Sequence, residues 1–140
     1  MTDLVVDASV VVKWYLDEPG SEAARLLQGK ALELAAPRLL PVEVANVLWK
    51  YIRKGSLDAR TGIRILATLA DAPIDWHDTN LLTSEALVVA AETGRTVYDC
   101  LYLALAVRCD CPMITADRKL YNALKEGTYG ARLLWIEDVT

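Results

Sequence analysis

The stretch from Leu4 to Leu16, LVVDASVVVKWYL, places an apolar strand directly before a carboxylate, with a hydroxyl two residues later and a helical pattern after that. A strand that is apolar on both faces is buried on both faces, as in parallel sheets. Asp7 therefore follows the end of a buried strand, where a carboxylate without partners is costly. We expect the rest of the chain to bring partners, and a cation, to this point.

Short apolar segments alternate with helical patterns along the rest of the chain. Ser9 and Ser21 are the expected caps of the first two helices. The segment 98–107 is apolar nearly all round, which is typical of a central helix. The alternation predicts an α/β fold with a parallel sheet covered on both faces. The predicted strands cover about residues 4–6, 32–36, 73–76, 112–115 and 132–136, and the predicted helices about 10–17, 21–30, 41–54, 56–72, 79–94, 98–107 and 118–125.

The composition suits a single domain over residues 1–140, and the formal net charge of −4 argues against a broad basic face for nucleic acid. A local path of Lys and Arg side chains that binds nucleic acid is still compatible with this charge.

No apolar run is long enough to span a membrane, and the N-terminus lacks the basic region of a signal peptide, so a cytoplasmic protein is expected. Cys109 and Cys111 have no second Cys or His pair, so we expect reduced thiols rather than a zinc site.

Four acids fall where strands end or helices begin. They are Asp7, Glu43, Asp99 and Asp117. In a doubly wound sheet these ends share one rim, and ligands bind there at the point where the strand order reverses. Taken singly, each acid has a plain explanation as a helix cap or a first-turn acid. If all four converge, a hard divalent cation such as Mg²⁺ or Mn²⁺ is needed to offset their repulsion.

Three polar residues are candidate supports for this site. Asn46 lies one turn after Glu43 and could hold a metal ligand or a substrate phosphate. Ser9 and Thr115 lie two residues from Asp7 and Asp117, where hydroxyls can orient carboxylates. Helix capping explains all three equally well at this stage.

Four motifs in order carry a family resemblance: VVDASV at 5–10, PVEVANVL at 41–48, YDCLYLALA at 98–106 and ITADRKL at 114–120. Together they resemble the PIN domain and, more narrowly, VapC-type toxins of toxin–antitoxin operons. The resemblance implies a three-layer α/β/α sandwich with five parallel strands. It also implies a ribonuclease that depends on Mg²⁺ or Mn²⁺, with Asp7, Glu43, Asp99 and Asp117 as its catalytic, metal-binding acids.

The resemblance further implies an endoribonuclease toxin that cleaves structured RNA, such as tRNA or a ribosomal RNA loop, and is neutralised by a VapB-like antitoxin. A homodimer is implied, and no membrane. Among the basic residues, Lys13 and Arg118 are the expected RNA contacts. Water activated by a metal needs no ribose 2′-hydroxyl, so we expect 5′-phosphate and 3′-hydroxyl ends.

Three other functions stay in view. The chain could be a PIN-fold nuclease for RNA processing outside a toxin–antitoxin system, or a PIN-fold binding module without activity, although none of the four acids is lost. A phosphohydrolase of the haloacid dehalogenase type would need a second Asp where this chain has Ser9.

Overall fold

The computed structural model describes residues 1–139 and contains a five-stranded parallel sheet with the order β3-β2-β1-β4-β5. Residue pairs such as Val5 with Ala35 and Val6 with Ile114 set the register around the central strand. β1 is fully buried, as its unbroken apolar sequence requires. The strands are β1 (Leu4–Val6), β2 (Leu34–Pro37), β3 (Ile74–His77), β4 (Met113–Thr115) and β5 (Leu133–Trp135).

The strand order reverses between β1 and β4. The chain builds β2 and β3 on one side of β1 and then returns to build β4 and β5 on the other side. Such a switch point leaves a crevice at the carboxyl ends of the two neighbouring strands. Asp7 and Asp117 follow these two strands, so the fold places both acids at this crevice.

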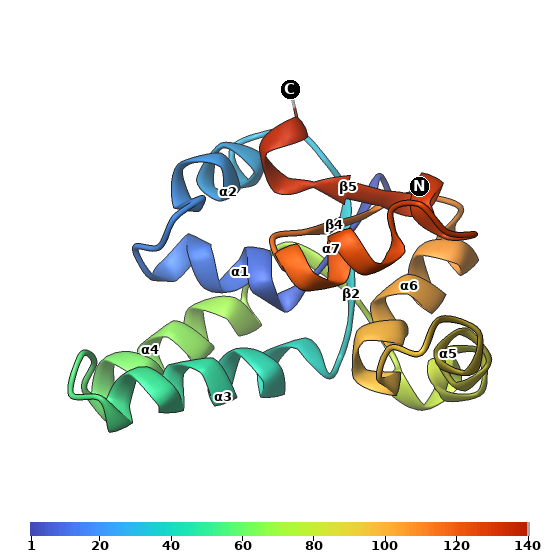
Figure 1. Cartoon of the computed structure of the whole chain (residues 1–140). Helices are drawn as coiled ribbons and strands as arrows, with labels where there is room; N and C mark the ends of the chain where they lie inside the picture. The colour runs from blue at the N-terminus through green and yellow to red at the C-terminus, as the bar shows by residue number, and fades with distance from the viewer. Residues whose placement is uncertain (140) are drawn as a thin grey trace.

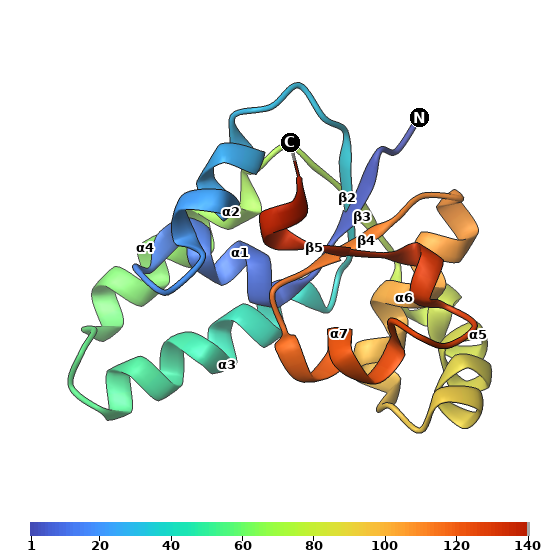
Figure 2. The same ribbon diagram turned by 45° about the horizontal axis from the view of Figure 1, so that its top comes forward.

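Helices cover both faces of the sheet, as expected for a three-layer α/β/α sandwich (Figure 1). α6 packs on β1, β2 and β4 with α5 outside it, and α1 lies on the other side together with α2 and α3. Both views show the α3–α4 hairpin and the α5–α6 pair on opposite sides of the strands (Figure 1 and Figure 2). The helices are α1 (Ala8–Tyr15), α2 (Ser21–Gln28), α3 (Leu40–Arg53), α4 (Ala59–Ala70), α5 (Thr79–Thr93), α6 (Val97–Cys109) and α7 (Arg118–Leu124), with short 3₁₀ turns η1 (Gly130–Arg132) and η2 (Ile136–Asp138).

The helix ends follow local chemistry. α3 has Pro41 in its first turn, and Gly94 ends α5 with a φ of 76°. In α6 every residue from Cys100 to Ala106 is buried, which explains why its sequence is apolar nearly all round. Among residues 1–139, no helix is long and apolar enough to cross a membrane.

Each predicted strand and helix is present, but two predicted caps are wrong. α1 begins at Ala8 with Asp7 at its N-cap, so Ser9 lies inside the helix. Gly20, with a φ of 93°, is the N-cap of α2. The Ser21 hydroxyl instead donates to the Leu16 carbonyl and accepts from the backbone N–H of Glu18, closing the turn before the helix.

Candidate active site

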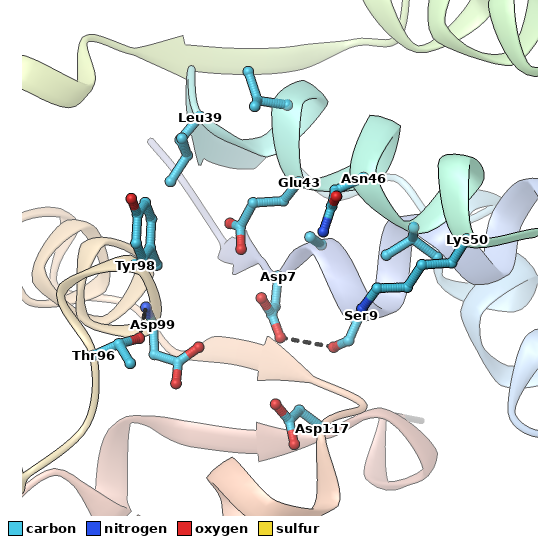
Figure 3. Close-up of a pocket in the computed structure, with 13 residues that line it drawn as sticks. Asp7, Ser9, Leu39, Glu43, Asn46, Lys50, Thr96, Tyr98, Asp99 and Asp117 are labelled. Carbon is cyan, nitrogen blue, oxygen red and sulfur yellow. Dashed lines mark hydrogen bonds between the residues drawn. The ribbon is translucent and has the colours of Figure 1, made fainter. Parts of the chain in front are cut away.

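Four carboxylates from separate parts of the chain line one cavity of about 620 Å³. Asp7 follows β1, Glu43 lies in the first turn of α3, Asp99 in the first turn of α6, and Asp117 precedes α7. Their side chains point toward the same space between α3 and the ends of β1 and β4 (Figure 3). The structure therefore brings together all four acids that the sequence singled out.

Asp7 is the most deeply placed of the four, with 9% of its surface exposed. Its Oδ2 accepts hydrogen bonds from the hydroxyls of Ser9 (2.7 Å) and Thr115 (2.8 Å). The pKa of Asp7 is raised to about 6, mainly by burial and also by the charges of Asp99 and Asp117, while the two hydroxyl donors oppose the shift. A charged Asp7 is thus held in place but costly, as expected for a ligand that awaits a cation.

Ser9 and Thr115 each serve two groups. The Ser9 hydroxyl also accepts from the backbone N–H of Ala116 (3.0 Å), and the Thr115 hydroxyl accepts from the N–H of Asp117 (3.0 Å). Each hydroxyl directs its proton toward Asp7, because a carboxylate oxygen can only accept and the hydroxyl is the donor of the pair. These contacts tie the ends of β1 and β4 together across the switch point, so both residues occupy the supporting position that the sequence suggested.

Glu43 faces Asp7 from the opposite wall of the cavity (Figure 3). The hydroxyl of Tyr102, from α6, donates to its Oε1. Burial raises the pKa of Glu43 to about 7, and the nearby charges of Asp7 and Asp99 act in the same direction, while the Tyr102 hydroxyl lowers it. Two of the four acids, Asp7 and Glu43, therefore carry pKa values raised by burial and by other acids of the cavity.

Asp99 and Asp117 have partners from their own helix ends. The Arg95 guanidinium lies 3.2 Å from Oδ2 of Asp99. The Oδ1 of Asp117 accepts from the backbone N–H of Leu120 (3.2 Å), which makes Asp117 the N-cap of α7. The capping interpretation of Asp117 is thus correct for one carboxylate oxygen, and the side chain still lines the cavity.

The same cavity wall holds two further side chains of α3. Asn46 lies one turn after Glu43, as expected, and Lys50 one turn later. Figure 3 shows the Lys50 side chain extending back toward Ser9. Sequence reasoning did not place Lys50 or Tyr102 in the site. The signal was present in the spacing, since Lys50 lies seven residues after Glu43 and Tyr102 three residues after Asp99.

The donor chemistry of the cavity fits a hard divalent ion. Carboxylate oxygens and an amide oxygen are the ligands that Mg²⁺ and Mn²⁺ prefer. Within residues 1–139 no three acidic, His or Cys side chains stand close enough together to ligate one ion directly. Such an open arrangement suits Mg²⁺, which keeps several of its waters and takes only one or two carboxylates directly. The residues thus fit such a metal chemically.

The remaining sequence candidates lie outside this cavity. Lys13 and Arg118 line a neighbouring hollow beyond Ala116. His77 is bound by Asp75 at 3.1 Å on the edge strand β3. The three cysteines are free thiols, as expected.

Comparisons with known proteins agree with this geometry. The sequence model of the PIN domain family matches residues 4–125. A protein of Pyrobaculum aerophilum named Ribonuclease VapC3 is 36% identical over 119 residues, which cover 84% of this chain and 91% of the relative. A second protein of that organism, named Exonuclease VapC9, is 34% identical over 100 residues, covering 66% of this chain and 68% of the relative.

A solved toxin–antitoxin complex from Klebsiella pneumoniae contains a chain with the same fold. It superposes with a TM-score of 0.68 at 13% identity and covers 98% of this chain and 100% of that one. The family match spans both strands that flank the switch point and all four acids. The chain belongs to the PIN domain family, among the VapC ribonucleases.

Proposed function

We propose that this chain is a Mg²⁺- or Mn²⁺-dependent endoribonuclease that acts as the toxin of a toxin–antitoxin pair. The observation that carries the proposal is the convergence of four carboxylates, from four separate segments, on one cavity at the switch point. The raised pKa values of Asp7 and Glu43 support it, because perturbed acids cluster at functional sites. The relative named Ribonuclease VapC3 supports the choice of RNA.

Asp7, Glu43, Asp99 and Asp117 would hold the metal, one or two of them directly and the others through its waters, with Asn46 beside them. Bound there, a divalent ion would supply an activated water and would stabilise negative charge on the phosphate during in-line attack. We expect hydrolysis without participation of the ribose 2′-hydroxyl, and products with 5′-phosphate and 3′-hydroxyl ends.

The chain's own residues provide orientation. Ser9 and Thr115 hold one oxygen of Asp7 and leave the other facing the cavity. Tyr102 fixes Oε1 of Glu43 from the side of α6. Fixed carboxylates reduce the reorganisation needed when the charge of the transition state develops. Since Asn46 lies between Glu43 and Lys50 on the cavity wall, its amide N–H group is placed to donate to a phosphate oxygen (Figure 3).

The proposed partner is a VapB-like antitoxin protein, and the proposed state is a cytoplasmic homodimer that binds it. The complex from Klebsiella pneumoniae, a structural neighbour, supports the antitoxin. The α3–α4 hairpin exposes Val42, Trp49 and Ile63, large apolar side chains of the kind that protein partners cover. The PIN-fold processing nuclease and the inactive binding module are the competing proposals, and a chain that cleaves no RNA in the assay below would favour the binding module.

The test is cleavage of RNA by the purified chain with Mn²⁺ and Mg²⁺. A circular single-stranded RNA and a structured tRNA serve as substrates, because a circle has no end and is opened only by an endonuclease. Sequencing of the product ends then reports 5′-phosphates or their absence. An enzyme that degrades the linear RNA but leaves the circle intact would be an exonuclease, as one relative is named, and would refute the endonuclease proposal.

Variants assign the activity to the cavity. Asp99→Asn removes one cavity carboxylate, and Asp71→Asn, at the C-cap of α4, is the matched control outside the cavity. We expect Asp99→Asn to abolish cleavage and Asp71→Asn to keep it. Full activity in Asp99→Asn would overturn the site assignment.

Metal binding has its own measurement. An ion that binds only the native state stabilises it and so raises the melting temperature. At an ion concentration of 100 times the Kd, the free energy of unfolding rises by about 2.7 kcal/mol. We expect millimolar Mn²⁺ or Mg²⁺ to raise the melting temperature of the wild type and of Asp71→Asn, but not of Asp99→Asn. An unchanged wild type would contradict the metal site.

A further inference from the structure

Three basic side chains lie at one end of the acidic cavity, and they differ in what binds them. Lys50 lines the acidic cavity itself. Lys13 and Arg118 line a second hollow of about 600 Å³, whose lining residue Ala116 is the chain neighbour of Asp117 in the first. The basic side chains that no carboxylate pairs determine how strongly this part of the surface attracts an anionic substrate.

Lys13 forms an ion pair within the protein. Its ammonium lies 3.2 Å from Oε1 of Glu18, and only 14% of its side chain is exposed. The other oxygen of Glu18 accepts the hydroxyl of Tyr51 from α3. Lys13 thus joins α1 to α3 through Glu18, and its charge is already neutralised. Its predicted role as an RNA contact stays a prediction, with less support than that of Arg118.

Arg118 and Lys50 have no ion-pair partner among the described residues 1–139. The guanidinium carbon of Arg118 lies 3.8 Å from the centre of the Trp135 ring. Tyr121 packs against the same indole at 5.5 Å, so Trp135 is itself held in place. A stacked guanidinium keeps its N–H groups, which point outward in the plane of the guanidinium, available for a phosphate.

The acids of the second hollow have partners of their own. Asp17 pairs with Arg25 at 2.8 Å, Glu18 with Lys13, and Glu137 accepts the indole N–H of Trp135 at 3.2 Å. Arg118 is therefore the basic side chain of this hollow that no carboxylate pairs, while Glu137, whose partner is a neutral N–H, keeps its negative charge. At the opposite end of the acidic cavity, Thr96 and Tyr98 are neutral, and nearby Arg95 is bound by Asp99.

We propose that Lys50 and Arg118 form a phosphate track that places the RNA backbone at this end of the acidic cavity. The inference rests on the proposed ribonuclease function. Lys50 binds the phosphate at the edge of the acids, where its side chain reaches toward Ser9 (Figure 3). Arg118 binds a neighbouring phosphate in the second hollow. Both counter the repulsion between RNA and the four carboxylates, and they set the direction in which the strand crosses the site.

The test measures RNA binding apart from cleavage. A 5′-fluorescein-labelled, single-stranded RNA of 20 nucleotides is titrated with protein in Ca²⁺, and intact probe is verified on a gel after each titration. The variants are Lys50→Gln and Arg118→Gln. Their matched controls are Lys54→Gln, at the C-cap of α3, and Lys119→Gln, the exposed neighbour of Arg118.

Each lost phosphate contact lowers the slope of log K against log [salt] by about 0.7 for single strands, which corresponds to about 5-fold weaker binding at 0.1 M salt. We expect this loss for Lys50→Gln and Arg118→Gln, and less than 2-fold change in the controls. Arg118→Lys, which keeps the charge, should recover most of the slope. Slopes equal to those of the controls would overturn the track.

A metal readout separates the track from damage to the acids. Lys50→Gln should keep the Mn²⁺-induced rise in melting temperature, because Lys50 is not a metal ligand; loss of that rise would also overturn the proposal. A wild type that binds RNA but cleaves nothing would refute the proposed function while leaving the track intact. A wild type that cleaves, with variants that bind like their controls, would refute only the track.

Discussion

Replacing Asp7 by Asn should stabilise the metal-free protein while removing its activity. Burial raises the pKa of Asp7 from 3.8 to about 6, so the folded chain holds this proton more tightly than the unfolded chain does. Because the native state binds more protons in that range, the free energy of unfolding falls as pH rises from about 4 through about 6. At 1.36 kcal/mol per pH unit, the charged carboxylate costs about 3 kcal/mol at pH 8.

The Asn side chain has the same shape, and its amide oxygen can still accept from Ser9 and Thr115. The variant should therefore gain up to about 3 kcal/mol over the wild type at pH 8, and almost nothing at pH 4. Urea denaturation in EDTA at the two pH values measures the difference. Because the charge of Asp7 also raises the pKa of Glu43, its removal lowers the cost of the charged Glu43 and shifts the difference in the same direction.

Asp58→Asn is the control of opposite sign. The backbone N–H of Thr61 donates to Asp58 (2.7 Å) and lowers its pKa, so this variant should be less stable than the wild type at pH 8. Mn²⁺ should stabilise Asp58→Asn but not Asp7→Asn. An Asp7→Asn protein that is no more stable than the wild type at pH 8 without metal would refute the reasoning that burial makes this charge costly.

Three further outcomes are expected. Cleavage in Mn²⁺ should fall steeply below about pH 7, because Asp7 and Glu43, with pKa values raised to about 6 and about 7, must lose their protons to bind metal; initial rates from pH 5.5 to 8.5 check this, and a flat profile would contradict it. Tyr102→Phe removes the hydroxyl that lowers the pKa of Glu43, so the Mn²⁺-induced rise in melting temperature should shrink at pH 7 and recover at pH 9. The free energy of unfolding, measured by urea denaturation, should fall by about 1 kcal/mol. Gly130→Ala should lower the melting temperature far more than Gly29→Ala, since a Cβ at residue 130 would lie 2.0 Å from the Lys125 carbonyl oxygen, against 3.6 Å from the nearest atom at residue 29; equal melting temperatures would show that the turn before β5 shifts freely.

The positions of the four acids could be predicted because the parallel sheet constrains them. A carboxylate directly after a buried strand, and another at the start of a helix that follows one, must lie at the same rim. Asp7 and Asp117 meet this condition in the sequence, and β1 and β4 prove to be neighbours. The order of the strands, by contrast, is a tertiary property, and the sequence indicated it only through the resemblance to a family.

The contacts that support the acids could not be predicted in the same way. In the sequence Ser9 fitted a helix cap and a support for Asp7 equally well, and the structure favours the second, because Asp7 takes the N-cap position and the Ser9 hydroxyl donates to its carboxylate. Tyr102 lies in an apolar helix, where an aromatic residue usually only packs in the core. Its hydroxyl reaches Glu43 because α3 lies close to α6 at this point. Trp135, at the end of β5, packs against Arg118 of α7, although it lies seventeen residues later in the chain. Such contacts depend on how layers pack, which local patterns do not report.

All four acids lie at helix N-termini, and this explains how the chain folds around them without a metal. Asp7 and Asp117 are N-caps, while Glu43 and Asp99 lie in first turns. Each helix N-terminus carries a partial positive charge that stabilises a nearby carboxylate by about 0.3–1 kcal/mol. Four such contributions, roughly 1–4 kcal/mol together, offset part of the cost that burial imposes on Asp7 and Glu43. The helix ends therefore lower the cost of the site without metal, and once a cation neutralises the carboxylates the same positive ends still face the cavity, where they attract a phosphate.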